Sequence, residues 1–171
     1  MTHTASGKRP LWGLRDRPGR LALAVFRLPV RVFQPHPERM PSDFLSFVHT
    51  GRKTGQPHQA VAMVLDDDPN SGEVVICAAW GPDTDWVRNL RARPAASVQH
   101  RRESFTPEQR FLDGPEAFDV TVRFRRAHPV RLRLFSGLLG WGDLRDDDAV
   151  RGFVHTHPFV AFRRPDESRT G

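Results

Sequence analysis

A hairpin pattern runs through residues 58–79, which read HQAVAMVLDDDPNSGEVVICAA. The apolar series from His58 to Leu65 predicts one strand with apolar side chains on both faces, and Val74 to Ala79 predicts the returning strand. Residues 66–72 between them carry Asp, Pro, Asn and Gly, each of which favours turn conformations. Two strands joined by so short a turn pair side by side in opposite directions, so this stretch predicts an antiparallel sheet.

Further elements flank the hairpin on both sides. Short apolar stretches predict strands at 44–50, 96–100, 105–112 and 157–164. Asp83 or Thr84 begins a helix that runs to Arg93 and is ended by Pro94, and residues 114–150 are helical with breaks at Pro129 and around 137–142. Strand hairpins with one inserted helix, followed by helices and a closing strand, predict an α+β domain built on a small antiparallel barrel.

The N-terminal part of the chain differs in composition from the rest. Residues 1–19 are polar and rich in Gly, Pro and Arg, which predicts a disordered basic lead-in. Residues 20–33 alternate apolar and arginine side chains, which predicts an amphipathic helix interrupted or ended at Pro29. That helix either packs on its own domain or presents a basic surface that touches a membrane or covers a cleft. We expect one domain over residues 20–165, with a tail at 166–171.

Charge and cysteine content exclude several classes of protein. The 171 residues carry a formal net charge of +6, but the surplus lies entirely in residues 1–39, and the remainder is balanced. This distribution argues against a nucleic-acid-binding domain, which carries its basic residues on a folded face. The single cysteine, Cys77, excludes a disulfide framework and a cysteine-based zinc site, and we expect a buried, inert thiol there. No apolar run is long enough to span a bilayer, so a cytoplasmic location is expected.

The densest chemical signal is the loop Gly51-Arg52-Lys53-Thr54-Gly55-Gln56-Pro57 between two predicted strands. Glycines allow a tight turn, while the arginine, the lysine and the threonine hydroxyl supply donors for a phosphate or another multivalent anion. The spacing of a Walker A loop is absent. On composition alone, an ordinary basic hairpin turn remains the alternative.

A second signal follows the hairpin, from Trp80 to Leu90. Two tryptophans six residues apart, Trp80 and Trp86, offer a flat wall for an aromatic ligand, and the start of the helix offers free amides to an anion. Arg88 and Asn89 extend that anion site. The alternative is that Trp86 and Leu90 simply pack the helix onto the barrel. His155 and His157 have no third ligand at suitable spacing, so no metal site is predicted.

Together these motifs resemble the deazaflavin-dependent nitroreductase family. The resemblance rests on Thr50 to Pro57 followed by Trp86-Val87-Arg88-Asn89-Leu90-x-Ala92-x-Pro94, and it is strong over residues 44–100. It implies the split β-barrel of flavin-reductase-like proteins, whose FMN-binding-like fold agrees with the antiparallel pattern above. It also implies coenzyme F420, a deazaflavin that carries a phosphodiester and a glutamate tail, as the cofactor.

The resemblance implies roles for individual residues. Arg52, Lys53 and Thr54 would hold the phosphate or the acidic tail, and the two strands of the hairpin would line the deazaflavin ring. The further residues implied in cofactor binding are His58, Gln59, Ala60, Val61, Ala62, Met63, Cys77, Ala78, Ala79, Trp80, Asp85, Trp86, Val87, Arg88 and Asn89. The chain has no tyrosine, so a proton must come from solvent, a histidine or a serine, and no catalytic side chain is assigned.

The expected activity is transfer of a hydride from reduced deazaflavin to a small conjugated acceptor such as a quinone, an enone or a nitro compound. Two alternatives keep the barrel. One exchanges the cofactor for FMN or haem, and the other is a non-catalytic carrier that binds F420 without turnover.

Overall fold

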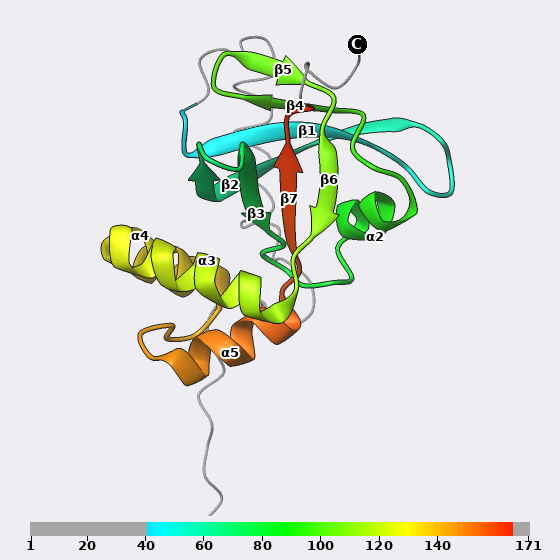
Figure 1. Ribbon diagram of the computed structural model, residues 1–171. Coiled ribbons are helices and arrows are strands. Elements are labelled where there is room, and N and C mark those ends of the chain that lie inside the picture. Colours follow the sequence, from blue (N-terminus) through cyan, green and yellow to red (C-terminus); the bar gives the residue numbers. More distant parts are fainter. Residues whose placement is uncertain (1–40, 166–171) are drawn as a thin grey trace, which may run out of the picture.

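The computed structural model describes residues 41–165 of the chain, and the predicted lead-in (1–19), amphipathic helix (20–33) and tail (166–171) lie outside them. Figure 1 shows the order of the described elements. These are β1 (Phe44–Thr50), β2 (Pro57–Asp68), β3 (Glu73–Cys77), α2 (Asp85–Ala92), β4 (Ser97–His100), β5 (Glu103–Phe105), β6 (Glu108–Phe111), α3 (Gly114–Ala127), α4 (Pro129–Leu139), α5 (Asp147–Thr156) and β7 (Phe159–Arg163).

All seven described strands form one curled sheet in the order β5-β4-β1-β2-β3-β7-β6, and every neighbouring pair is antiparallel. The long strand β2 connects the two halves. Its first part pairs with β1 up to Met63, and its second part pairs with β3 from Val64 onward. The register shifts between Val64 and Asp66, and such a bulge bends a strand and increases its twist. The predicted α+β fold on a split antiparallel barrel is confirmed.

The interior of the curled sheet is filled from both halves. Leu45 and Phe47 of β1 meet Ile76 of β3 and Phe162 of β7, and all four side chains are at most 1% exposed. Alternation along each strand places these side chains on one face, as the period of two requires. Leu90 of α2 packs into the same cluster, so α2 is fixed to the barrel.

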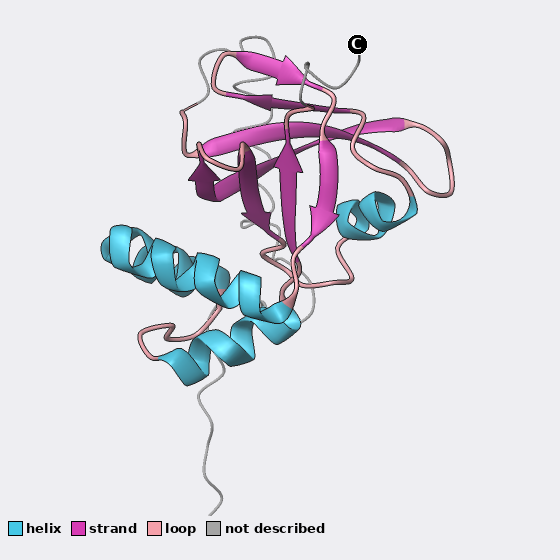
Figure 2. Ribbon diagram, in the orientation of Figure 1, coloured by secondary structure: helices cyan, strands magenta, loops and turns pink. Residues whose placement is uncertain are grey.

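The opposite face of β3 and β7 is covered by the three helices α3, α4 and α5. Val75, Phe159 and Ala161 of these strands pack against Val120 of α3 and Phe153 of α5. Figure 2 shows these three helices gathered on one side of the sheet, with α2 placed apart from them. The predicted helical breaks are observed, because α3 ends before Pro129 and the next interruption begins at Gly140, whose φ is 71°.

Two strand predictions need correction. Asp66, Asp67 and Asp68, expected in the turn, extend β2 and pair with β3. Two of these carboxylates have partners distant in sequence: Asp66 accepts from Arg123 at 2.5 Å and Asp67 from Arg101 at 2.6 Å.

The second correction concerns the expected strand 105–112. It is divided into β5 and β6, which pair with different neighbours. Pro107 lies between them and lacks the N–H that a continuous ladder would use.

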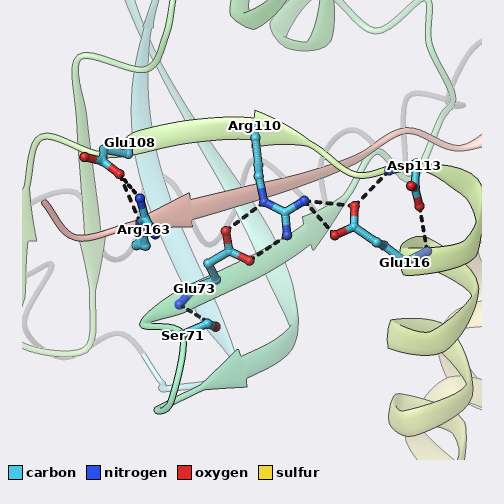
Figure 3. Close-up of polar contacts among 7 residues, drawn as sticks. All are labelled: Ser71, Glu73, Glu108, Arg110, Asp113, Glu116 and Arg163. Atoms are coloured by element: carbon cyan, nitrogen blue, oxygen red, sulfur yellow. Dashed lines mark hydrogen bonds and ion pairs between the residues drawn. The ribbon is translucent and has the colours of Figure 1, made fainter.

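A polar cluster joins the barrel to α3 (Figure 3). The Arg110 guanidinium donates to both carboxylate oxygens of Glu73, at 2.8 Å each, and also to both oxygens of Glu116 at 2.8 Å. Glu116 and Asp113 form a capping box at the start of α3. Glu108 and Arg163 pair beside them. Arg110 thus connects β3, β6 and the first turn of α3.

The outer face of α4 is apolar. Val130 is 80% exposed and Leu134 67%, one turn apart. No helix among residues 41–165 is long and apolar enough to cross a bilayer.

Candidate functional site

The loop between β1 and β2 forms a tight, closed turn. The Gly51 amide donates to the Gln56 carbonyl and the Gly55 amide to the Gly51 carbonyl, both at 2.8 Å. Gly55 has a φ of 70°, which favours glycine. A Cβ on Gly51 would lie 2.6 Å from the Thr54 hydroxyl oxygen and 3.0 Å from Nε2 of His58, so any larger residue there would displace these two side chains. The two glycines therefore fix the path of the loop that carries the predicted anion-binding residues.

Arg52 of this loop is anchored to helix α2. Its backbone amide and its Nη1 both donate to Oδ1 of Asn89 at 3.0 Å, and Nη1 also donates to Asp85 at 3.0 Å. The Arg52 side chain is 25% exposed. Lys53 and Thr54 are exposed at the tip of the loop. The structure thus brings Arg52 together with Asp85 and Asn89, two predicted site residues of α2 that lie more than thirty positions after it in the sequence.

Asn89 also contacts a histidine that sequence reasoning did not select. Its Nδ2 lies 3.0 Å from Nδ1 of His49, a β1 residue that is 6% exposed. The pKa of His49 is lowered chiefly by burial and further by the charge of His58, while Asp85 opposes the shift. His49 precedes the Gly51 loop by two residues in a strand of apolar side chains. That position in an apolar strand is the signal that could have identified it.

An apolar pocket lies between β2, the end of β3 and α4. Its cavity volume is about 50 Å³. The side chains around it are Val61, Ala62, Met63, Leu65, Cys77, Ala79, Trp80, Trp86, Phe135, Leu139 and Trp141. Seven of them were predicted from the sequence; Leu65, Phe135, Leu139 and Trp141 were not. Phe135 and Leu139 are four apart on α4, a spacing that marks them as neighbours on one helix face.

Trp141 closes one side of this pocket. Its indole Nε1 donates to the Ala79 carbonyl at 2.9 Å, and its ring packs on Phe153 with centroids 4.9 Å apart. The segment after α4 is therefore attached directly to the hairpin end. The start of α2 links the pocket to the cationic loop, because Asp85 contacts Arg52 and the next residue, Trp86, lines the pocket.

The remaining predicted residues lie around these two features. Ala78 and Val87 are fully buried, and Ala60 packs toward the barrel interior. Arg88 pairs with Asp83. The first residues of β2, His58 and Gln59, are exposed, although both faces of this strand were expected to be buried. Thr84 precedes α2 as predicted, but its hydroxyl donates to the Gly81 carbonyl and does not cap the helix.

Cys77 is 8% exposed, and burial raises the pKa of its thiol well above the ordinary range. The thiol group is therefore protonated at neutral pH. This fits the predicted inert role, since the thiolate is the reactive form.

Fold and site together define an antiparallel split barrel in which an apolar pocket adjoins a cationic loop. The sequence matches the model of the F420H(2)-dependent quinone reductase family over residues 36–129, which is more than half of the chain. The chain belongs to this family, and its cofactor is coenzyme F420. It is a reductase, and the choice between F420 and FMN or haem is thereby decided.

Solved structures resemble the chain in fold. One described as a domain-swapped dimer has a TM-score of 0.50 and 17% identity, covering 85% of this chain and 100% of its own. The F420-H2 dependent reductase FDR-A has a TM-score of 0.46 and 20% identity, and the match covers 70% of this chain and 93% of that one. An FMN-binding protein from Nostoc punctiforme, related to pyridoxamine 5'-phosphate oxidase, has a TM-score of 0.43 and 9% identity over 89% and 83%. No curated protein sequence matches closely.

The residues present fit the chemistry of F420. The guanidinium of Arg52, the ammonium of Lys53 and the hydroxyl of Thr54 form a donor set for phosphate and carboxylate groups. The adjoining pocket supplies apolar and aromatic walls for a planar ring. A three-ring heterocycle is larger than this cavity of about 50 Å³, so the pocket as the described residues form it holds only part of such a ring.

Proposed function

We propose that this protein transfers a hydride from reduced F420 to a small conjugated acceptor, either a quinone, an enone or a nitro compound. The observation that supports the proposal is the continuity of the cationic loop with the apolar pocket at Asp85 and Trp86. A ligand with a planar aromatic ring and an anionic tail matches such a site. The family supplies the cofactor and the reductase class, and the acceptor is our proposal.

Reduced F420 supplies the hydride when it is bound. The protein's task is then to orient the two reactants and to exclude water. In our proposal Arg52, Lys53 and Thr54 hold the anionic tail, the pocket residues of β2 and β3 line the ring, and residues 85–89 close the site and reach the anionic end through the start of α2. No tyrosine is present in the chain, so the proton that accompanies hydride transfer comes from solvent, a histidine or a serine.

Calorimetric titration with F420 tests the cofactor-binding part of this proposal. Arg52→Ala and Lys53→Ala should each weaken binding by roughly ten- to a hundredfold, because a hydrogen bond to a charged group contributes roughly 1.5–3 kcal/mol. Arg151→Ala is the matched control, since Arg151 is an exposed arginine of α5 paired with Asp148 and lies outside the predicted site. Affinity that is indifferent to both loop variants would show that the tail binds elsewhere.

The acceptor is tested by oxidation of bound reduced F420 in the presence of a quinone, an enone or a nitroaromatic compound. Turnover with at least one of them supports the proposal. The absence of turnover with every one of these acceptors, in a protein that binds F420, would contradict the proposed acceptor class.

We also propose that residues 20–165 form one domain and that the protein is cytoplasmic.

We further propose that residues 20–33 make a peripheral contact with an anionic membrane. The support for the last point is that the charge surplus of +6 is confined to residues 1–39. Flotation with phosphatidylglycerol vesicles tests it, and Arg27→Glu with Arg31→Glu should reduce binding. Equal binding of the wild type and the double variant to the vesicles would contradict the membrane contact.

A further inference from the structure

The orientation of the Asn89 side-chain amide is determined by its neighbours. Asn89 is 4% exposed, and its Oδ1 accepts from both the backbone amide and Nη1 of Arg52. Oxygen is the only atom of the amide that can accept, so this assignment leaves Nδ2 facing Nδ1 of His49 at 3.0 Å. Nδ2 is a donor, and therefore His49 has to accept.

This arrangement specifies the protonation state of His49. Nδ1 of the imidazole accepts only when it carries a lone pair, which requires the neutral ring with its proton on Nε2. A protonated ring would place two N–H donors face to face. Rotation of the Asn89 amide would relieve that conflict but would turn Nδ2 toward the two donors of Arg52, which replaces one conflict with two.

The groups packed around His49 come from three elements. His58 of β2 stacks on its ring with centroids 5.6 Å apart, Asp85 and Asn89 approach from α2, and Arg52 lies beyond Asn89 in the loop. Burial and the charge of His58 lower the pKa of His49 against the opposing effect of Asp85. The ring is consequently neutral at pH 7, as the hydrogen bond from Asn89 requires.

We propose that His49 is a positioning residue for F420 binding: by accepting from Asn89 it fixes the amide orientation that holds Arg52 in place for the anionic end of the cofactor. This inference rests on the proposed function, in which Arg52 contacts that end. Its consequence is that F420 affinity falls when His49 becomes protonated. The fall occurs below the ordinary histidine pKa of 6.5, because the pKa is lowered in the folded protein.

Calorimetric titration of the full chain with F420 between pH 5 and pH 8 tests this proposal. His49→Asn places a side-chain oxygen near the position of Nδ1, which accepts from Asn89 but does not titrate. Relative to this variant, the wild type should lose affinity by about fivefold toward pH 5, which corresponds to one hydrogen bond of about 1 kcal/mol. Because both proteins are titrated at the same pH, the effect of F420's own ionisation on affinity cancels in the comparison. His155→Asn, an exposed histidine of α5, should behave as the wild type does.

A second variant should reverse the pH response. In Asn89→Asp, the carboxylate accepts from Arg52 and also from a protonated His49, so acidification should strengthen the contact with His49. The ratio of the F420 affinity of Asn89→Asp to that of His49→Asn should be at least as high at about pH 5.5 as at neutral pH. A decline matching that of the wild type would overturn the proposal.

The outcomes separate this inference from the proposed function. If the wild type and His49→Asn show the same pH profile while Arg52→Ala loses binding, the proposal is overturned and the proposed function stands. If the wild type binds no F420 at any pH, both fail.

An NMR measurement on the ligand-free wild type tests the proposal even where the variants fold poorly. The NMR signal of the Asn89 side-chain amide in the wild type should shift with a single apparent pKa below 6.5, at the same pH as the change in affinity. A signal that is constant with pH would also overturn the proposal.

Discussion

Replacing Arg110 by methionine removes the charge that joins β3, β6 and α3 but keeps an apolar stem of similar length. Arg110 is 46% exposed and Glu73 is 17% exposed, so their two-pronged contact is partly screened. Discounted for that exposure, the pair contributes about 1.5 kcal/mol, and the more exposed pair with Glu116 about 0.5 kcal/mol. Arg110→Met should therefore lower the free energy of unfolding by about 2 kcal/mol, or the melting temperature by about 4–8 °C.

Urea unfolding followed by circular dichroism measures this difference, and its pH dependence is specific to the cluster. The hydrogen bond from Arg110 lowers the pKa of Glu73 below its ordinary value of 4.5. A carboxylate with a lowered pKa contributes stability above its unfolded pKa and loses it as pH falls through the folded value. The deficit of Arg110→Met should accordingly be full at neutral pH and shrink as the pH falls below the ordinary glutamate pKa of 4.5.

Two further variants complete the test. In a double-mutant cycle, adding Glu73→Gln to Arg110→Met should lower the free energy of unfolding only slightly further, because Arg110→Met has already removed the interaction between the two side chains. Arg151→Met, which removes an exposed ion pair on α5, is the control and should change stability by less than about 0.5 kcal/mol. An Arg110→Met deficit no larger than that of the control, or one that is constant with pH, would refute the reasoning.

Three other predictions follow from local packing. Gly51→Ala should weaken F420 binding by about tenfold or more in a calorimetric titration, because its Cβ would collide with Thr54 and reshape the cationic loop; Gly137→Ala, in open space on α4, is the control and should leave affinity unchanged. Phe162→Ala should cost about 3–5 kcal/mol in urea unfolding, because this side chain is 0% exposed in the barrel interior; a cost below about 1 kcal/mol would contradict the packing described. Cys77 should react with a thiol reagent only as fast as the protein unfolds, since burial keeps the thiol protonated and covered; rapid labelling of the folded protein would show otherwise.

The strands were predictable where sequence pattern alone decides them. β1 was predicted with the bounds observed, because Phe44–Thr50 is an apolar run followed directly by a glycine turn. The end of β2 was not predictable, since Asp66 and Asp67 have the composition of a turn. They are extended because they pair with Val75 and Val74 of β3, and Arg123 and Arg101, which only the tertiary structure brings near, pair with their carboxylates on the surface.

The candidate site was predictable in its motifs but not in its completion. Gly51, Arg52 and Trp86 lie in local patterns with recognisable spacing. His49 and Trp141 act through contacts with Asn89 and Ala79, which lie forty and sixty-two positions away in the sequence. The position of His49 in an apolar strand is a signal in the sequence, but no local period records these contacts, so the partners of His49 and Trp141 emerge only from the fold.

The sheet order has a consequence for synthesis of the chain. β7, the last strand of residues 41–165, lies between β3 and β6, so β6 has no partner in the sheet until β7 arrives. On the ribosome, therefore, one edge of the nascent barrel stays open until residue 163 has left the exit tunnel. Unpaired edges promote association between chains, so the nascent protein is exposed to aggregation during this interval.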